Sequence, residues 1–204
     1  MRVVTSIAEL GHSRATVATL GAFDGVHRGH QALVSHVVEE ARARGGLSVV
    51  VTFCPHPARV LRPESAPRLI TRFAERRARL ALLGLDVLVE LPFTLELAAR
   101  SAEDFVAEVL VGIGVVHVVV GPDLRFGRDR AGDFALLERL GVANSFTVSA
   151  QSPVEIDGEV VSSTRIRKLL AAGDVAKAAW LLGAPHRVVG SVIQGDRRGR
   201  TIGV

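Results

Sequence analysis

The chain has 204 residues, of which 48% are hydrophobic and 23% are charged, and its formal net charge is +4. This composition supplies a full hydrophobic core for one sizeable domain and excludes a disordered chain. The single cysteine, Cys54, excludes a disulfide framework and a multi-cysteine zinc site, and the lack of a basic block or aromatic ladder argues against a nucleic-acid partner.

Short β-branched segments alternate with longer amphipathic segments over the first 150 residues. Strands are predicted over 16–20, 47–53, 86–91, 115–121 and 145–150, and helices over 29–44, 72–83, 102–111 and 133–140. Segments 49–51 and 115–120 are almost entirely apolar, as expected of strands that are covered on both faces. The alternation predicts an α/β fold built on a doubly wound parallel sheet.

Two further helices are predicted over 165–172 and 175–182, and Ala184-Pro185 ends the helical pattern. The remaining segment, 186–204, has a strand-like pattern and is too short to fold alone. We therefore predict one domain over 1–185, followed over 186–204 by either the start of a second domain or a strand that packs on the first.

The segment 21–30 reads Gly-Ala-Phe-Asp-Gly-Val-His-Arg-Gly-His and directly follows the predicted strand 16–20. Ligands of open α/β sheets bind in such turns, where glycines allow a close approach of the backbone and the helix N-terminus favours an anion. His27 and His30 are therefore predicted to donate hydrogen bonds to a phosphate; two ordinary turn histidines are the alternative. Asp24 fits a carboxylate that accepts backbone N–H groups, with a direct metal contact as its alternative.

The segment 162–167 reads Ser-Ser-Thr-Arg-Ile-Arg and opens a predicted helix. Its free backbone N–H groups and hydroxyls suit a second phosphate site, and the Arg167 guanidinium can grip two phosphate oxygens. The alternative is a plain helix cap made by Ser162 or Ser163.

Two more loops with polar side chains follow predicted strands. Pro55-His56-Pro57 ends the strand 47–53, because proline cannot continue a central ladder. Asp123, Arg125 and Phe126 come after the strand 115–121, again at a carboxyl end. A strand stop and a polar turn are the respective alternatives.

Five segments together resemble one known family. Segment 21–30 is similar to the (H/T)xGH motif of the nucleotidyltransferase superfamily, in the longer form GxFDGVHxGH of the FMN adenylyltransferase module of prokaryotic bifunctional riboflavin kinase/FAD synthetases. Segment 162–167 resembles the superfamily motif SSTxIR. Segments 52–57, 91–106 and 121–132 resemble TFxPHP, PF(T/D)…FV and G-x-(N/D)-F-x-F-G-x4-G. Leu124 and Cys54 depart from the family pattern, which usually has an aromatic and an acidic residue there.

The resemblance implies a Rossmann-like nucleotidyltransferase fold and a reaction that joins FMN and ATP to give FAD and pyrophosphate. Mg²⁺ is expected to bridge phosphate oxygens and to be held mainly by water and substrate, with no residue of the chain assigned as its ligand. The implied catalytic residues are His27, His30 and Arg167. The implied nucleotide-binding residues are Gly21, Phe23, Asp24, Gly25, Gly29, Ser163, Thr164 and Arg165. The implied flavin-binding residues are Pro55, His56, Pro57, Asp123, Arg125 and Phe126.

The end of the chain has its own resemblance. Segment 187–204 is similar to the first strand and phosphate loop of the riboflavin kinase module, whose motif continues as GFPTAN. Because this sequence stops before the Thr and Asn of that motif, we expect no riboflavin kinase activity in this chain. The alternatives to the adenylyltransferase are a nucleotidyltransferase of the same fold acting on pantetheine phosphate or nicotinate mononucleotide, and a non-catalytic flavin- or nucleotide-binding module.

The expected partners are small molecules, ATP and FMN. The first residues lack the apolar core of a signal peptide, and no apolar run approaches the roughly 20 residues of a membrane span. These features predict a cytoplasmic protein without a membrane partner.

Overall fold

The computed structural model describes residues 1–10, 15–191 and 193. Its centre is a six-stranded sheet in the order β1-β4-β3-β2-β5-β6, in which every neighbouring pair is parallel. The strands are β1 (Arg2–Val4), β2 (Thr16–Leu20), β3 (Leu47–Cys54), β4 (Val87–Pro92), β5 (Val115–Val120) and β6 (Thr147–Ala150). The chain builds β2, β3 and β4 toward one edge and then crosses to β5 and β6, so the carboxyl ends of β2 and β5 mark the switch point.

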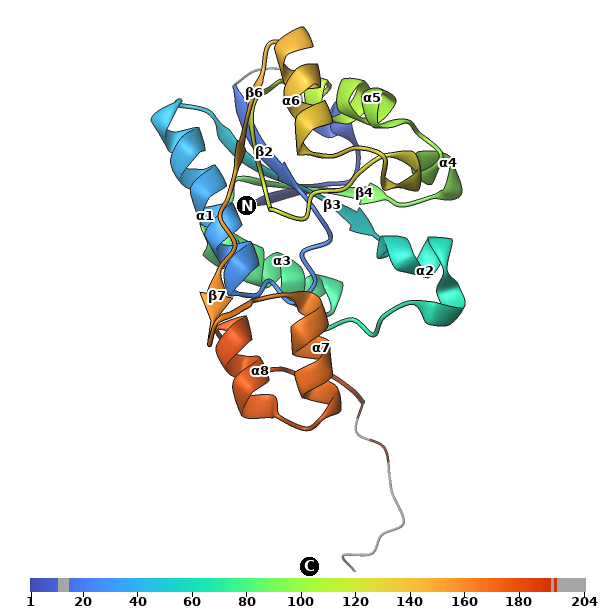
Figure 1. The fold of residues 1–204 in the computed structure, drawn as a ribbon, viewed down its shortest axis with the longest axis vertical. Coiled ribbons are helices and arrows are strands. Elements are labelled where there is room, and N and C mark those ends of the chain that lie inside the picture. Colours follow the sequence, from blue (N-terminus) through green and yellow to red (C-terminus); the bar gives the residue numbers. More distant parts are fainter. Residues whose placement is uncertain (11–14, 192, 194–204) are drawn as a thin grey trace, which may run out of the picture.

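Helices cover both faces of the sheet (Figure 1). One face packs against α1 (Arg28–Ala43) and α3 (Phe73–Leu82), and the other against α5 (Ala102–Phe105), its π-helical extension (Val106–Val111) and α6 (Phe134–Ala143). The short elements are α2 (Pro57–Leu61), α4 (Leu95–Ala98) and the 3-10 turns Ile7–Glu9, Pro63–Ser65 and Arg128–Arg130. The doubly wound parallel sheet predicted from the sequence is confirmed.

The alternation of side chains along each strand explains the two-sided core. Val49 and Val51 pack with Phe105 and Leu110 on one face, whereas Val50 packs with the residues of α1 on the other. Successive side chains of a strand point to opposite faces, so a strand covered on both sides must be apolar throughout. The continuous valine runs in the sequence therefore indicate a sheet that is buried on both faces.

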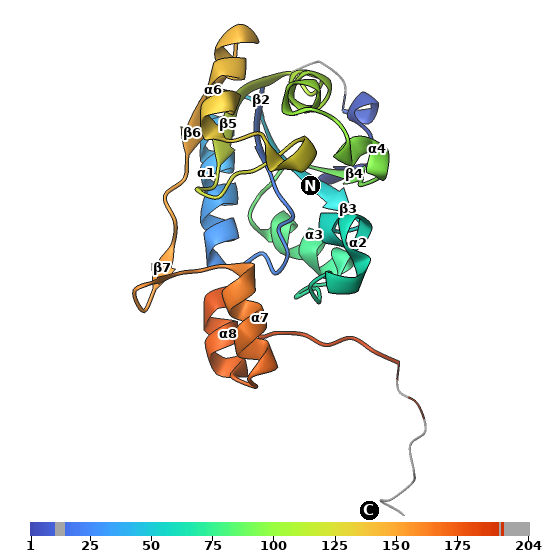
Figure 2. The same ribbon diagram turned by 45° about the vertical axis from the view of Figure 1, so that its right-hand side comes forward.

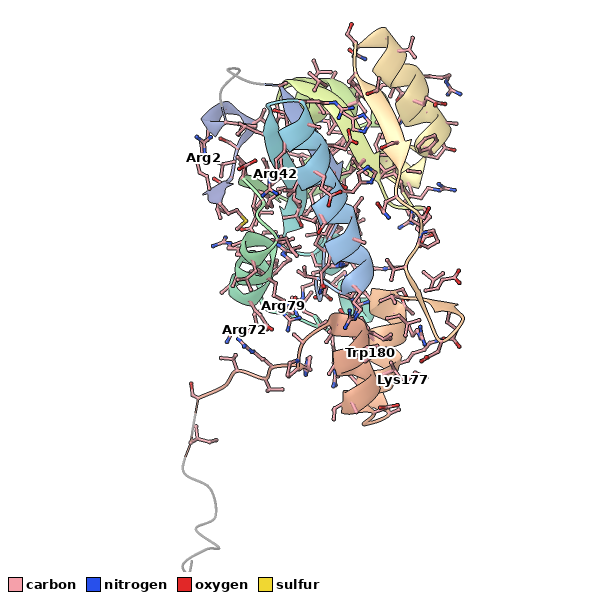
Figure 3. All side chains as sticks on the ribbon, turned by 90° about the vertical axis from the view of Figure 1, so that its left-hand side faces the viewer. Arg2, Arg42, Arg72, Arg79, Lys177 and Trp180 are labelled. Carbon is pink, nitrogen blue, oxygen red and sulfur yellow. The ribbon has the colours of Figure 1, made fainter. Side chains whose placement is uncertain are left out.

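A smaller unit lies beyond the carboxyl ends of the strands. After β6 a long connection carries the hairpin β7 (Glu155–Ile156) and β8 (Glu159–Val160) to the antiparallel pair α7 (Ser163–Ala171) and α8 (Val175–Leu182), as Figure 2 shows. Ile166, Leu181 and Leu182 form a small core there with Ile70. In Figure 3, Trp180 of α8 lies beside the first turn of α1, where the Arg28 guanidinium sits 4.6 Å from the centroid of its ring.

The predicted elements match the structure closely, with a few differences. The helix predicted over 102–111 changes from α to π geometry at Val106. β1, α2, α4 and the β7–β8 hairpin were not predicted, because segments of two to five residues carry too few periods of a pattern. The strand-like character predicted after 185 is absent over 186–191, which has no helix or strand; residue 192 and the segment 194–204 lie outside the described residues. None of the helices in the described part of the chain has the length and apolar character that a membrane crossing requires.

Candidate active site

The turn between β2 and α1 holds its backbone in uncommon conformations. Phe23, Gly25 and Val26 have φ angles of 50°, 89° and 43°. Glycine adopts this region freely, whereas a β-branched residue such as Val26 rarely does. Each non-glycine residue there costs on the order of 1–3 kcal/mol, so contacts around the turn must hold it in place. Phe23 and Val26 are both buried in the core beside α1, which supplies part of that constraint.

Asp24 supplies a second constraint. Its carboxylate is 2% exposed and accepts hydrogen bonds from the backbone N–H of Ile70 at 3.0 Å and of Thr71 at 3.1 Å. The Thr71 hydroxyl in turn accepts from the Gly25 N–H at 3.0 Å. Arg167 Nη2 completes the arrangement at 2.6 Å from Asp24 Oδ2. The carboxylate thus links the turn to the segment before α3 and to α7. Its acceptance of backbone N–H groups agrees with the prediction from the sequence.

His27 and His30 form a stacked pair at the start of α1. Their ring centroids are 3.6 Å apart and the rings are inclined by 16°. His27 is the N-cap of α1, and its Nδ1 accepts the backbone N–H of His30 at 3.3 Å. Because Nδ1 is an acceptor, the proton of the neutral His27 ring must lie on Nε2, which makes this nitrogen a hydrogen-bond donor. A Cβ on Gly29 would lie 3.2 Å from the His27 ring, so a side chain at position 29 would crowd the ring.

The imidazoles around this turn are held neutral. Burial lowers the pKa of His27 to about 4, with the Arg167 charge also lowering it and the Asp24 carboxylate opposing the shift. Burial and the neighbouring His27 lower the pKa of His30 well below its usual range. Burial likewise lowers the pKa of His56. Near pH 7 these rings therefore act as neutral donors and acceptors instead of fixed positive charges.

The start of α7 docks directly on the turn. Ser162 caps the helix by accepting the Arg165 N–H at 3.2 Å, and the Ser163 hydroxyl donates to the Asp24 carbonyl oxygen at 2.9 Å. Arg167 is held by Asp24 and by its Nε, which donates to the Arg68 carbonyl oxygen at 2.9 Å. The two motifs, more than 130 residues apart in the sequence, are therefore neighbours in space.

Arg165 and Thr164 face away from this junction. Arg165 Nη1 donates to the carbonyl oxygens of Ile156 and Glu159, both at 3.0 Å, and its Nε lies 2.9 Å from a Glu159 carboxylate oxygen. Thr164 is exposed. The described contacts of Arg165 thus fasten the β7–β8 hairpin to α7, and neither residue is part of the cleft lining described next.

A cleft of about 1,090 Å³ opens at the switch point of the sheet. The predicted residues in its wall are Gly21, Phe23, His27, Gly29, His30, His56, Pro57, Asp123, Arg125, Phe126 and Ser163. Asp24, Gly25, Pro55, Thr164, Arg165 and Arg167 are not among the described residues that line it. The histidine pair and the two predicted substrate loops therefore share one cavity, with Arg167 set behind the wall.

The comparisons with known proteins bear directly on this arrangement. The sequence profile of the FAD synthetase family matches residues 10–165 of the chain. The chain belongs to the FAD synthetase family. The match spans the turn after β2, the cleft loops and the start of α7, which are the parts that the geometry brings together.

Several relatives within the FAD synthetase family are named bifunctional riboflavin kinase/FMN adenylyltransferase. The protein of Pseudomonas fluorescens is 45% identical over 191 residues, which are 93% of this chain and 61% of the relative. That of Escherichia coli K12 is 37% identical over 206 residues, which cover 100% of this chain and 66% of the relative. The chain thus spans about three fifths to two thirds of the length of these relatives.

Two solved structures share the fold. A crystal structure from Streptococcus pneumoniae, described as a macrolide-efflux protein, superposes with a TM-score of 0.85 at 33% identity, covering 98% of this chain and 66% of that one. Pantothenate synthetase from Thermus thermophilus superposes with a TM-score of 0.55 at 20% identity, covering 90% of this chain and 81% of that one. The second likeness shows the fold alone.

Some residues that line the cleft were not assigned a function from the sequence. Phe53 and Phe93 pack edge to face with centroids 5.4 Å apart and line the cleft with Leu97. The segment 151–154, between β6 and the hairpin, lines it as well. Phe53 and Phe93 stand in segments that resemble the family motifs, but an aromatic residue at the end of a strand can also serve only for packing.

Proposed function

We propose that this chain is an FMN adenylyltransferase, which joins FMN and ATP to give FAD and pyrophosphate. A phosphate oxygen of FMN attacks the α-phosphorus of ATP and forms a new P–O bond. The bond from that phosphorus to the oxygen bridging to the β-phosphate breaks, and its electron pair leaves with pyrophosphate. No covalent enzyme intermediate is needed, so positioning and charge stabilisation carry the catalysis.

The observation that carries this proposal is the neutral, stacked pair His27 and His30 in the wall of the cleft. Donors that are fixed before the reaction stabilise charge that develops on phosphoryl oxygens without having to reorganise. His27 Nε2–H is such a donor, because Nδ1 is already occupied as an acceptor of the His30 N–H. Both rings are assigned to the oxygens of the α-phosphoryl group.

The remaining nucleotide contacts are assigned to the backbone around the pair and to α7. Gly21 and Gly29 line the cleft and let the substrate approach the main chain. Ser163 lies at the N-terminus of α7, where backbone N–H groups favour the β- and γ-phosphates. The sequence predicts direct phosphate contacts for Arg167, Thr164 and Arg165. The ion pair of Arg167 with Asp24 supports instead a role in positioning the turn and in contributing positive potential from behind the wall.

The flavin is assigned to the other end of the cleft. Phe53, Phe93 and Phe126 give this part an aromatic wall, which suits the isoalloxazine ring. Asp123 and Arg125 lie beside it and provide an acceptor and a donor for the polar edge of a flavin or for its phosphate. His56 caps α2 by accepting the Ala58 N–H at 3.2 Å, and with Pro57 it lines the cleft, so both are assigned to the flavin.

We assign magnesium to the substrate, as the complex of Mg²⁺ with ATP. Within residues 1–10, 15–191 and 193, no three His, Cys, Asp or Glu side chains converge as a metal site. The carboxylate nearest the histidines, Asp24, already accepts two backbone N–H groups and an arginine. Phosphates and water are the usual ligands of Mg²⁺ in nucleotide sites, so the ion enters with the nucleotide.

The test is direct. The chain is incubated with FMN, ATP and MgCl₂, and FAD is followed by the loss of flavin fluorescence and by chromatography. We expect FAD and pyrophosphate in equal amounts. If an adenylylated product formed only from nicotinate mononucleotide or pantetheine phosphate, the chain would be another nucleotidyltransferase of the same fold. Binding of FMN and ATP without any product would identify a non-catalytic module.

The lowered pKa of His27 predicts how stability depends on pH. The ring binds a proton near pH 4 in the native state, and at its usual value of 6.5 in the unfolded state. Between these values the unfolded chain binds more protons, so the free energy of unfolding decreases as the pH falls through this window. A shift of this size corresponds to about 3 kcal/mol. In His27→Asn, which keeps a good N-cap, we expect the acid-side decrease to be smaller by that amount.

Urea unfolding of both proteins between pH 4 and pH 7.5 measures this difference. The comparison uses the change in free energy with pH, so a constant offset between the two proteins cancels. A His27→Asn protein that loses stability on acidification as steeply as the unchanged chain would show that His27 is not held neutral by burial.

A further inference from the structure

A buried ion pair lies beneath the turn that carries the histidines. Arg76, in the first turn of α3, is 3% exposed, and Glu90, on β4, is 2% exposed. Arg76 Nη2 lies 3.2 Å from Glu90 Oε1, and Arg77 Nε donates to Glu90 Oε2 at 2.8 Å. Removing two charges from water is costly, so a buried pair is a weak source of stability by itself. The position of this pair beside two loops of the cleft points to a role in holding those loops.

The Arg76 guanidinium also reaches two backbone carbonyl groups at the edge of the cleft. Its Nη1 donates to the Ala22 oxygen at 2.8 Å, and its Nη2 donates to the Phe53 oxygen at 3.4 Å. Ala22 immediately precedes Phe23, the first residue of the turn with positive φ. Phe53 is the penultimate residue of β3, just before the loop that carries His56. One planar side chain therefore joins the start of the phosphate turn to the start of the predicted flavin loop.

The neighbouring arginines on α3 make different contacts. Arg77 shares Glu90 with Arg76 and is 45% exposed, and within the described part of the chain it makes no hydrogen bond to either loop. Arg79 approaches the Gly25 oxygen at 3.4 Å and the Pro185 oxygen at 3.3 Å, and Figure 3 shows it at the junction of α3 with the C-terminal unit. Arg76 contacts both the turn that follows β2 and the carboxyl end of β3.

We propose that Arg76 is a positioning residue for adenylyl transfer, which sets the distance between the phosphate turn and the flavin loop. This inference rests on the proposed function. The attack requires the FMN phosphate and the α-phosphorus of ATP to lie in line, and the two substrates are held by loops that Arg76 links. Glu90 holds the guanidinium through the ion pair at Nη2, and a lysine, which lacks the planar fork, cannot make the three contacts together.

The matched variants are Arg76→Lys and Arg77→Lys. They introduce the same change at adjacent positions, in the same helix and beside the same carboxylate. For Arg76→Lys we expect kcat to fall about 10- to 100-fold, with KM for ATP and FMN changed by less than about threefold, because misplaced substrates bind but react slowly. For Arg77→Lys we expect kcat within about twofold of the unchanged chain, because Arg77 contacts neither loop and a lysine keeps a positive charge beside Glu90.

A second readout does not depend on turnover. Amide hydrogen exchange of segments 22–28 and 53–58 is expected to speed up in Arg76→Lys and to remain unchanged in Arg77→Lys. If Arg76→Lys does not fold, the double variant Arg76→Met, Glu90→Leu removes both charges and keeps an apolar core, and the same changes in kcat and exchange are expected.

The outcomes separate the two proposals. Equal kcat values for the two lysine variants, or exchange in both segments that stays at the level of the unchanged chain, would overturn the role of Arg76. If the unchanged chain forms no FAD, the adenylyltransferase assignment fails. The exchange of the two segments then decides by itself whether Arg76 links these loops.

Discussion

Replacing His30 by alanine is expected to lower kcat for FAD formation by about 10²- to 10³-fold while the chain stays folded. The His30 ring stacks on His27 at 3.6 Å and lies 5.0 Å from the Phe23 ring, so it is fixed before substrate arrives. Its Nδ1 is buried and has no hydrogen-bond partner within the described part of the chain. The His30 residue also lines the cleft, so another part of its ring is placed to meet a substrate phosphate. Steady-state kinetics with FMN and ATP measure the loss.

Two control variants show whether the loss is chemical. His36→Ala removes a half-buried imidazole from the same helix that does not itself line the cleft, and kcat is expected to stay within about threefold. His30→Gln retains an N–H donor of similar reach and should recover part of the lost kcat. Thermal unfolding of all three variants reports on folding. Near-normal turnover by a folded His30→Ala protein would remove His30 from the mechanism.

Most of the central sheet could be predicted because its pattern is strong. The strands at 16–20, 47–53 and 115–121 are long, β-branched and apolar on both sides, and the structure confirms them within one residue at each end. β1 was not predicted, since three residues at the sheet edge carry no period. The hairpin β7–β8 was missed for the same reason, and its fixation by Arg165 depends on contacts that no local pattern encodes.

The sequence indicated several residues of the candidate site, but it did not indicate which of them contact one another. Glycines and histidines in the turn after 20 indicate a ligand because few other uses explain them, and the structure brings His27, His30 and Ser163 to one cleft. A phosphate contact of Arg167 stays a prediction, and the structure adds a partner that was not predicted, since the guanidinium is 2.6 Å from Asp24. A sequence shows that an arginine is present, whereas its partner is set by how α7 docks. Arg76 gave no signal either, because one arginine among several on a helix looks like a solvated face.

The second large effect is expected at Asp24. Asp24→Ala should lower the free energy of unfolding by about 3–5 kcal/mol, because it leaves the partly buried Arg167 without its carboxylate. It also leaves the backbone N–H groups of Ile70 and Thr71 without their acceptor. The turn would then lose a clamp at Gly25 and Val26, where its backbone has positive φ. Urea unfolding at pH 7 measures the difference.

Asp24→Asn separates the charge from the hydrogen bonds. The amide oxygen can still accept from Ile70 and Thr71, while the ion pair with Arg167 is lost, so an intermediate decrease is expected. Asp123→Ala is the control, because this aspartate is exposed in the wall of the cleft and should change stability by no more than about 0.5 kcal/mol. If Asp24→Ala were as mild as Asp123→Ala, the turn would be held by the packing of Phe23 and Val26 alone. The contacts that Asp24 makes between the two sequence motifs would then contribute nothing measurable to the free energy of unfolding.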